Sequence, residues 1–214
     1  MIKECFLFVT LVALAFVSEI RADIITNGSF EEPSITANTS TILTPAFWTT
    51  EGTSPALHNG FPTNGFPGAQ QGDQYLGMGV AGGGIPNGIS QIISIPTAGT
   101  YQFTWFDTTL VGFGTSSPYD IRILDLSDNL IASDSFEAYT GTTVWNPRSF
   151  EVNLLSDDFT LEVIPTGPSG RVATFFDNIS VTAVPEPDSL IFLATGCLAC
   201  FLRRNRRAER VTMR

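Results

Sequence analysis

The feature that most constrains the fold is an alternation of apolar and polar residues in short runs, separated by turn-forming residues. In the run Tyr101-Gln-Phe-Thr-Trp105, aromatic side chains occupy every second position. Successive side chains of a β-strand point to opposite faces, so one face of this strand is expected to be buried, with Trp105 in the core. The same alternation recurs in residues 119–123, 150–154 and 159–163.

These runs predict an all-β chain. Eight or nine strands in one domain of this size predict a β-sandwich of two sheets, most simply a jelly roll. Residues 31–72, rich in Thr, Pro, Gly and Asn, are expected to be mostly loop, and a loop of that length is often functional. We expect a hairpin turn at 125–129 and strands near 23–27, 73–79, 88–95, 100–108, 119–126, 129–136, 144–153, 158–165 and 172–183.

The charge of the central region excludes one class of partner. Residues 23–184 contain three Arg, no Lys and sixteen Asp or Glu, which gives a net charge of −13. Such a surface repels phosphate backbones, so we expect no nucleic-acid binding. An acidic surface suits solubility and the binding of divalent cations.

Residues 1–22 have the pattern of a secretory signal peptide. Lys3 supplies a positive start, Cys5 to Val17 is apolar, and Ala22 is a small residue at a plausible cleavage point. The alternative is an uncleaved anchor. Together with the apolar segment near the other end, this pattern predicts that the central region is exported.

That second apolar segment, residues 189–202, has 14 residues without charge. As a helix it would span roughly 21 Å, against a bilayer core of about 30 Å, so it is a short transmembrane span. Residues 203–214 carry six Arg and one Glu, a net charge of +5, and a basic cluster of this kind lies on the cytoplasmic side. The alternative is a buried core helix.

The end of the chain resembles the PEP-CTERM sorting signal of Gram-negative bacteria. The matching sequence covers 184–207, with the motif at 184–188, the apolar run at 189–202 and the basic cluster at 203–207; a basic tail, 208–214, extends beyond it. The resemblance implies anchoring in the inner membrane, processing by an exosortase, and delivery to the cell surface or extracellular matrix, often alongside exopolysaccharide. The residues that carry it are Val184, Pro185, Glu186, Pro187, Arg203, Arg204, Arg206 and Arg207.

Residues 23–183 show a second resemblance, to galactose-binding-like β-sandwiches, which include many carbohydrate-binding modules. It rests on Asn27-Gly-Ser-Phe-Glu31 near the start and Phe176-Asp-Asn-Ile-Ser-Val181 near the end. The resemblance implies a structural calcium between the first and last strands. Its oxygen ligands would come from Asn27, Glu31 and Asp177, and Ca²⁺ prefers such ligands. The alternative is that these carboxylates accept backbone N–H bonds.

Three aromatic residues are candidates for binding a sugar, because sugars stack on flat aromatic faces. Trp48 lies in the long loop, Trp145 is followed by Asn146, and Tyr75 is a weaker candidate. The alternative for each is a place in the hydrophobic core. A polysaccharide-binding surface protein is therefore one hypothesis, and a structural or adhesive matrix protein without a specific glycan site is the other.

Catalytic motifs find little support, so we expect no enzyme. His58 is the only histidine and falls in the predicted loop, and the sequence has no GxSxG motif. Asp107 and Asp120 would be the first carboxylate pair to suspect for a glycosidase. Residues 77–82 match GxGxxG, but Gly and Pro follow where a nucleotide site requires a helix.

Overall fold

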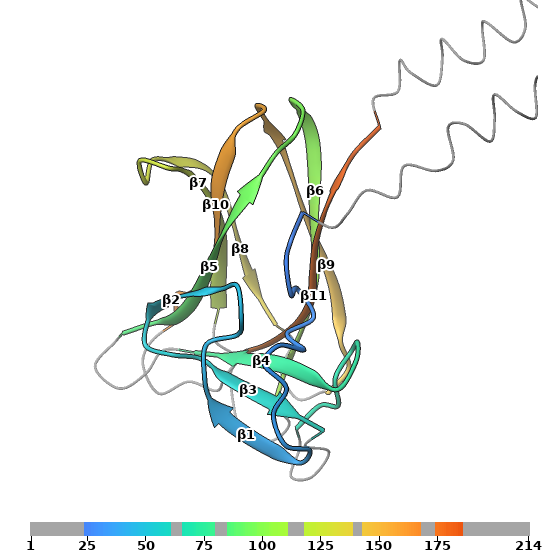
Figure 1. Ribbon diagram of the computed structural model, residues 1–214. Coiled ribbons are helices and arrows are strands. Elements are labelled where there is room, and N and C mark those ends of the chain that lie inside the picture. Colours follow the sequence, from blue (N-terminus) through green and yellow to red (C-terminus); the bar gives the residue numbers. More distant parts are fainter. Residues whose placement is uncertain are drawn as a thin grey trace, which may run out of the picture.

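The computed structural model describes residues 24–60, 66–79, 85–110, 118–138, 143–167 and 174–185 (Figure 1). Within these ranges the regular elements are all strands, and no helix long and apolar enough to cross a membrane occurs in them. The predicted signal peptide, the apolar run 189–202 and the arginine cluster lie outside the described residues, as do Glu186 and Pro187.

Eleven strands form two antiparallel sheets that pack face to face. The six-stranded sheet has the order β1-β3-β4-β11-β6-β9, and the five-stranded sheet has the order β2-β5-β10-β7-β8. This arrangement confirms the predicted all-β sandwich. The strands are β1 Thr39–Ile42, β2 Thr49–Gly52, β3 Ala56–Asn59, β4 Gln74–Met78, β5 Asn87–Ser94, β6 Gly99–Thr109, β7 Pro118–Asp125, β8 Leu130–Glu137, β9 Asn146–Leu154, β10 Asp158–Pro165 and β11 Thr174–Ala183.

One of the sequence predictions about strands was wrong. The described part of the region 31–72 is mostly outside strands, as expected, although it contains three short strands, β1 to β3. Residues 24–27 form bends where a strand was expected, because a side chain takes the place of a neighbouring strand. The buried amide of Gln91 accepts the N–H of Thr26 at 2.8 Å and donates to its carbonyl at 2.9 Å.

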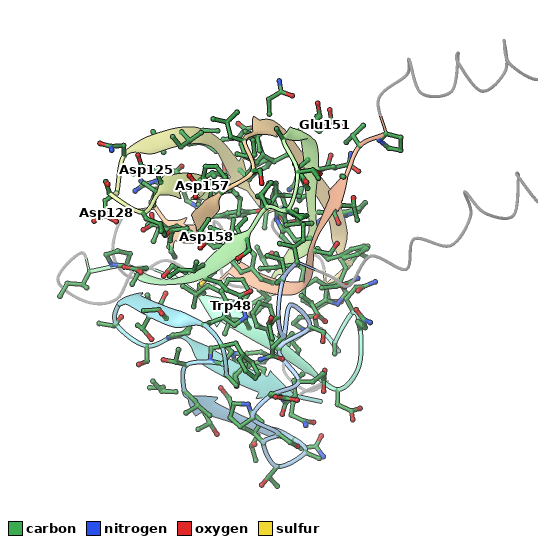
Figure 2. All side chains as sticks on the ribbon, turned by 45° about the horizontal axis from the view of Figure 1, so that its top comes forward. Trp48, Asp125, Asp128, Glu151, Asp157 and Asp158 are labelled. Atoms are coloured by element: carbon green, nitrogen blue, oxygen red, sulfur yellow. The ribbon has the colours of Figure 1, made fainter. Side chains whose placement is uncertain are left out.

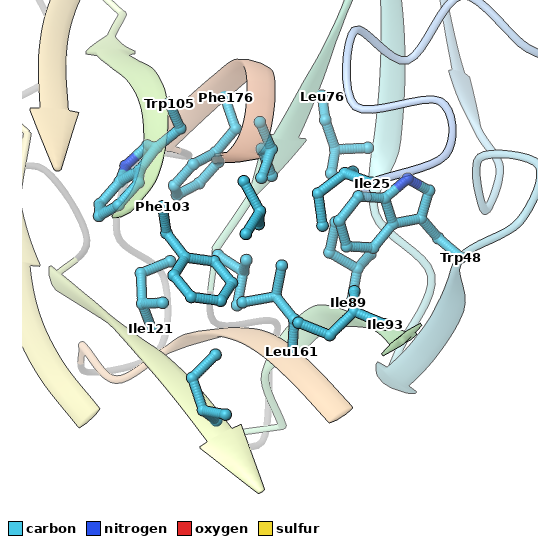
Figure 3. Close-up of a cluster of buried hydrophobic side chains, with 14 of the residues drawn as sticks. Ile25, Trp48, Leu76, Ile89, Ile93, Phe103, Trp105, Ile121, Leu161 and Phe176 are labelled. Atoms are coloured by element: carbon cyan, nitrogen blue, oxygen red, sulfur yellow. The ribbon is translucent and has the colours of Figure 1, made fainter. Parts of the chain in front are cut away.

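The core lies between the two sheets and is built from the alternating positions (Figure 3). On β6, Tyr101, Phe103 and Trp105 are each 1% exposed, which confirms the predicted inward face and the place of Trp105. They meet Ile121 of β7 and Leu161 of β10 from the five-stranded sheet. Burial of large apolar side chains on both inner faces is the main source of stability for such a sandwich.

A buried polar network also joins the sheets. Tyr119 of β7 donates to Asp107 Oδ2 at 2.7 Å and accepts the indole N–H of Trp105 at 2.9 Å. Arg148 of β9 donates from Nε to the same carboxylate oxygen at 2.8 Å and from Nη2 to the carbonyl of Glu137 at 2.8 Å. Because a buried carboxylate without partners is costly, this ion pair and these hydrogen bonds fix how the ends of β6, β7, β8 and β9 meet.

The opposite end of the sandwich is acidic. Asp125 forms the predicted hairpin turn between β7 and β8, where its Oδ1 accepts the N–H groups of Ser127 and Asn129 at 2.8 and 2.9 Å. Figure 2 shows Asp128, Asp157 and Asp158 in the same part of the molecule. Much negative charge therefore lies away from the outer face of the six-stranded sheet.

Candidate functional site

The outer face of the six-stranded sheet carries rows of hydrogen-bonding side chains, which are uncharged except for Glu151 of β9, the acceptor of a 3.1 Å bond from Gln102. On β6 the outward positions include Thr100, Gln102 and Thr104, because they alternate with the buried aromatic residues. Thr104 shares a hydrogen bond of 2.8 Å with Ser180 of β11. Thr100 donates to Asn153 of β9 at 2.7 Å. These cross-strand bonds hold the hydroxyl and amide groups in fixed positions on a half-exposed surface.

At the β3–β4 side of this sheet, the outer face carries a second aromatic cluster, separate from the core. His58 of β3 and Tyr75 of β4 are directly paired and stack with ring centroids 5.1 Å apart and an interplanar angle of 10°. Phe175 of β11 meets both rings edge-on, at 5.2 and 5.4 Å. Phe66 lies 5.4 Å from His58 and 5.7 Å from Phe175.

The sequence analysis missed most of this cluster. It placed His58 in a loop, whereas His58 lies in β3 and is 6% exposed. Phe66 and Phe175 were not considered at all. The available signal was the consecutive pair Phe175-Phe176, since neighbouring residues of a strand face opposite sides and two bulky aromatics indicate burial on both faces.

Gly77 makes room for the cluster. A Cβ at this position of β4 would lie 2.7 Å from His58 Nε2 and 3.0 Å from Phe175 Cε1. Residues 77–79 of the GxGxxG match therefore end a strand, and Gly77 serves aromatic packing.

Trp145 and Tyr75, two of the predicted ligand residues, lie together. Their ring centroids are 5.8 Å apart in an edge-to-face arrangement. The indole N–H of Trp145 donates to the carbonyl of Gly68 at 2.8 Å. Trp145 is half-buried, whereas Tyr75 is 0% exposed. Of the two, Trp145 is therefore the residue within reach of a ligand in this conformation.

Trp48 does not join them. It is 6% exposed, packs 5.7 Å from Phe30, and donates its indole N–H to the carbonyl of Asn27 at 3.1 Å. Figure 3 shows it in the core beside Ile25. Its neighbour Phe47 is 63% exposed instead. The expectation that Trp48 offers a ring face to a sugar does not fit this burial, and its role here is packing.

Glu31 and Asp177, two of the three predicted calcium ligands, are brought to the same segment. Glu31 Oε1 accepts the N–H groups of Asp73 and Gln74, both at 2.9 Å. Asp177 Oδ2 accepts those of Gln70 and Gln71 at 2.8 and 3.0 Å. The carboxylates thus hold the chain before β4 against the sheet, as the alternative interpretation expected.

Asn27, the third predicted ligand, makes other bonds. Its Oδ1 accepts the N–H of Glu32 at 3.1 Å, and its Nδ2 donates to the carbonyls of Glu32 and Ala46 at 2.7 and 3.0 Å. Among the described residues, no group of three or more His, Cys, Asp or Glu that could hold a metal ion is found. Of the three predicted ligands, Glu31 and Asp177 thus bind neighbouring parts of one segment, and Asn27 binds elsewhere.

Burial sets the protonation of two groups on this face. Burial raises the pKa of Asp177 to about 7, and the nearby charge of Glu31 adds to that rise, although three backbone N–H donors oppose it. Burial lowers the pKa of His58 to about 4, so the imidazole is neutral at neutral pH. In both cases the low-dielectric surroundings favour the uncharged form.

The structure separates the carboxylates considered for glycosidase chemistry. Asp107 points between the sheets and is paired with Arg148 at 2.8 Å. Asp120 lies on the outer face of the five-stranded sheet and is paired with Arg122 at 3.0 Å. Carboxylates on opposite sides of a sheet cannot flank one sugar bond, so this pair forms no active site.

Comparison with known proteins identifies the fold. No family profile matches the sequence, and no curated protein is similar to it. Among solved structures, the carbohydrate-binding module TmCBM61, in complex with β-1,4-galactotriose, has a TM-score of 0.53 and 16% identity; the match covers 76% of this chain and 99% of that one. The chain therefore has the β-sandwich fold of a carbohydrate-binding module.

Two enzymes contain a similar domain. The enzymatically active domain of tailspike protein 4 from bacteriophage CBA120 has a TM-score of 0.51 and 16% identity, over 76% of this chain and 21% of that one. The arabinose-bound α-L-arabinofuranosidase MgGH51 has a TM-score of 0.51 and 17% identity, over 75% of this chain and 26% of that one. In both, the similarity covers only a small part of the enzyme.

We predict that Asp177→Asn removes a pH dependence of stability. The pKa of Asp177 is about 7 in the folded chain, against an ordinary value of 3.8. The contribution of this carboxyl group to the free energy of unfolding is therefore fully present below pH 3.8 and is lost as the pH rises through 7. Relative to the variant, the wild-type free energy of unfolding should fall by a few kcal/mol between about pH 4 and pH 7, at roughly 1.4 kcal/mol per pKa unit. Urea unfolding at pH 4.5, 5.5, 6.5 and 7.5 measures this.

Asp125→Asn is the control for this experiment. Hydrogen bonds from Asn129 and Ser127 lower the pKa of Asp125, so its titration lies below this pH range. Parallel pH profiles for the wild type and Asp177→Asn would contradict the prediction.

Proposed function

We propose that this chain is an exported, non-catalytic protein that binds polysaccharide on the outer face of its six-stranded sheet. The observation that carries the proposal is the position of Trp145. It is the one tryptophan of the three that is not in the buried core, and it lies just before β9, in contact with Tyr75 of the outer face. A half-buried aromatic ring on a sheet face that also carries hydroxyl and amide groups is the combination that sugar recognition uses.

The fold supports the same proposal. TmCBM61, whose whole length matches this chain, was solved with β-1,4-galactotriose bound. The charge of −13 in residues 23–184 favours a neutral polysaccharide over an anionic one. The alternative is a structural or adhesive matrix protein that makes protein contacts without a specific glycan site.

We predict that the full-length chain is retarded in native gels containing β-1,4-galactan or arabinan, with calcium present. Trp145→Ala should weaken the interaction about tenfold, which corresponds to roughly 1.4 kcal/mol, because the ring that covers the sugar is lost. Trp145→Phe keeps a ring and should retain most of the retardation. The dissociation constants follow from migration at several polysaccharide concentrations.

Trp48→Phe is the matched control, since Trp48 lies in the core and should change stability without changing retardation. Alginate, an acidic polysaccharide, should retard the chain least. Free migration through all three gels would favour the alternative, a structural matrix protein.

We also propose that an exosortase-type system sorts the chain. The support is the sequence from Val184 to Arg207, and the structure adds that Val184 follows directly on β11, with Pro185 exposed. In a host with an exosortase, mass spectrometry of the surface-delivered protein should find an end near residues 184–188. Replacing Pro185 and Pro187 by Ala should leave the unprocessed chain in the inner membrane. Normal processing of this variant would contradict sorting through the motif.

Calcium is a further proposal, with Glu31 and Asp177 as ligands. A divalent cation would neutralise two carboxylates whose mutual repulsion and burial disfavour charge. The full-length chain should then melt at a higher temperature with calcium than with chelator, and more so at pH 7.5 than at pH 5, where Asp177 holds a proton. Glu31→Gln should abolish the difference, while Glu151→Gln, on the exposed part of β9, should not. If calcium leaves the melting temperature of the wild type unchanged, the proposal that Glu31 and Asp177 bind calcium is wrong.

A further inference from the structure

The aromatic cluster of His58, Tyr75 and Phe175 contains polar atoms that its packing does not explain. Tyr75 is 0% exposed and His58 is 6% exposed, yet Tyr75 Oη and His58 Nδ1 have no hydrogen-bond partner in the part of the chain that the structure describes. Buried polar groups in folded proteins are nearly always paired, and an unpaired group costs free energy. A phenylalanine at either position would fill the same space without that cost.

The cluster is covered by residues 66–73, here called the cover segment, which forms no strand. Its end is held at Asp73, which donates to Glu31 at 2.9 Å and accepts the N–H of Gly60 at 3.2 Å, and the rest is attached by single contacts. Phe66 packs against His58 and Phe175, Gly68 accepts the indole N–H of Trp145, and two backbone N–H groups donate to Asp177. Gln70 Oε1 in the same segment also lacks a hydrogen-bond partner. Segments with few buried contacts open at low free energy relative to core strands.

The unpaired atoms match the chemistry of a sugar ring. A tyrosine hydroxyl both donates and accepts, and a neutral imidazole nitrogen does one or the other, as do the hydroxyls of a sugar. The rings of His58, Tyr75 and Phe175 offer an apolar surface for the C–H face of the same sugar. Trp145 touches Tyr75 and is itself half-buried, so it connects the cluster to the exposed surface.

We propose that the cluster beneath the cover segment is a second sugar subsite, in which Tyr75 Oη and His58 Nδ1 bind hydroxyl groups once residues 66–73 move off the sheet. The inference rests on the proposed polysaccharide binding and extends it: Trp145 binds first on the surface, and the neighbouring sugar unit enters under the cover segment. The polar atoms of Tyr75 and His58 then serve ligand binding, although they destabilise the fold when no ligand is bound.

Tyr75→Phe tests the proposal, with Tyr101→Phe as the matched control. Tyr101 is also buried, but its hydroxyl donates to the carbonyl of Thr97 at 2.8 Å. In the full-length chain, Tyr75→Phe should melt no lower than the wild type, and Tyr101→Phe should melt lower. The binding measurements use the polysaccharide, among galactan, arabinan and alginate, that retards the wild type most. Tyr75→Phe should bind it at least fivefold more weakly than the wild type does. Tyr101→Phe should bind it with wild-type affinity.

Opening of the cover segment is measured by amide hydrogen exchange. The amides of Gln70 and Gln71, which donate to Asp177, should lose protection when that polysaccharide is added at saturation. His58→Phe keeps the ring contacts and should also bind at least fivefold more weakly, with no loss of stability.

Several results overturn the subsite. One is a Tyr75→Phe variant that melts as far below the wild type as Tyr101→Phe, because the hydroxyl then has a structural partner such as a buried water. Another is wild-type affinity in Tyr75→Phe, or gained protection at Gln70 and Gln71 with ligand. A wild-type chain that binds none of the three polysaccharides overturns the proposed function as well, whereas wild-type binding with an unaffected Tyr75→Phe overturns the subsite alone.

Discussion

The structure depends on the first part of one strand. Thr174, Phe175, Phe176 and Asp177 of β11 are buried on both faces of the six-stranded sheet, whereas the outward positions that follow, such as Ser180, are half-exposed. Phe176 points into the core between the sheets, and Phe175, its neighbour in sequence, points into the outer aromatic cluster. The two-residue period of a strand makes this division unavoidable. A single dipeptide therefore anchors the sandwich and also builds the surface on which a ligand site can form.

The next residue, Asp177, connects this strand to the covering chain. It points outward and accepts the N–H groups of Gln70 and Gln71, while Glu31 accepts those of Asp73 and Gln74. Backbone groups outside a sheet need partners when they approach a buried surface, and here two carboxylates supply them. The segment before β4 is thus attached by these hydrogen bonds, by Phe66, and by a backbone bond of 3.2 Å from the N–H of Gly60 to the carbonyl of Asp73, next to the β3–β4 pairing.

The sequence predicted those strands in which apolar and polar residues alternate clearly. β6, β7 and β10 each have one buried face, so their alternation identified them and placed Trp105 in the core. β4 is buried at every position from Gln74 to Met78, so alternation carries no information there, and Tyr75 was considered a surface ligand residue.

The positions of residues that are held by side-chain hydrogen bonds were not predicted, for a different reason. Trp48 lies outside any long pattern and is buried because its indole N–H finds the carbonyl of Asn27. Segment 24–27 reads as a strand in sequence, but the amide of Gln91, 65 residues away from Thr26, replaces the pairing it would need. Contacts of this kind depend on the assembled fold and leave no local signal.

The outer cluster contains two titrating groups whose effects on stability change in opposite directions with pH. The pKa of His58 is lowered to about 4. The contribution of the neutral imidazole to the free energy of unfolding is therefore fully present above pH 6.5 and is lost as the pH falls toward 4. The pKa of Asp177 is raised to about 7, so its contribution is lost as pH rises from about 4 to 7. Between about pH 4 and pH 6.5 the two contributions therefore offset each other. Above pH 6.5 only the loss due to Asp177 continues, because the contribution of His58 is then fully present.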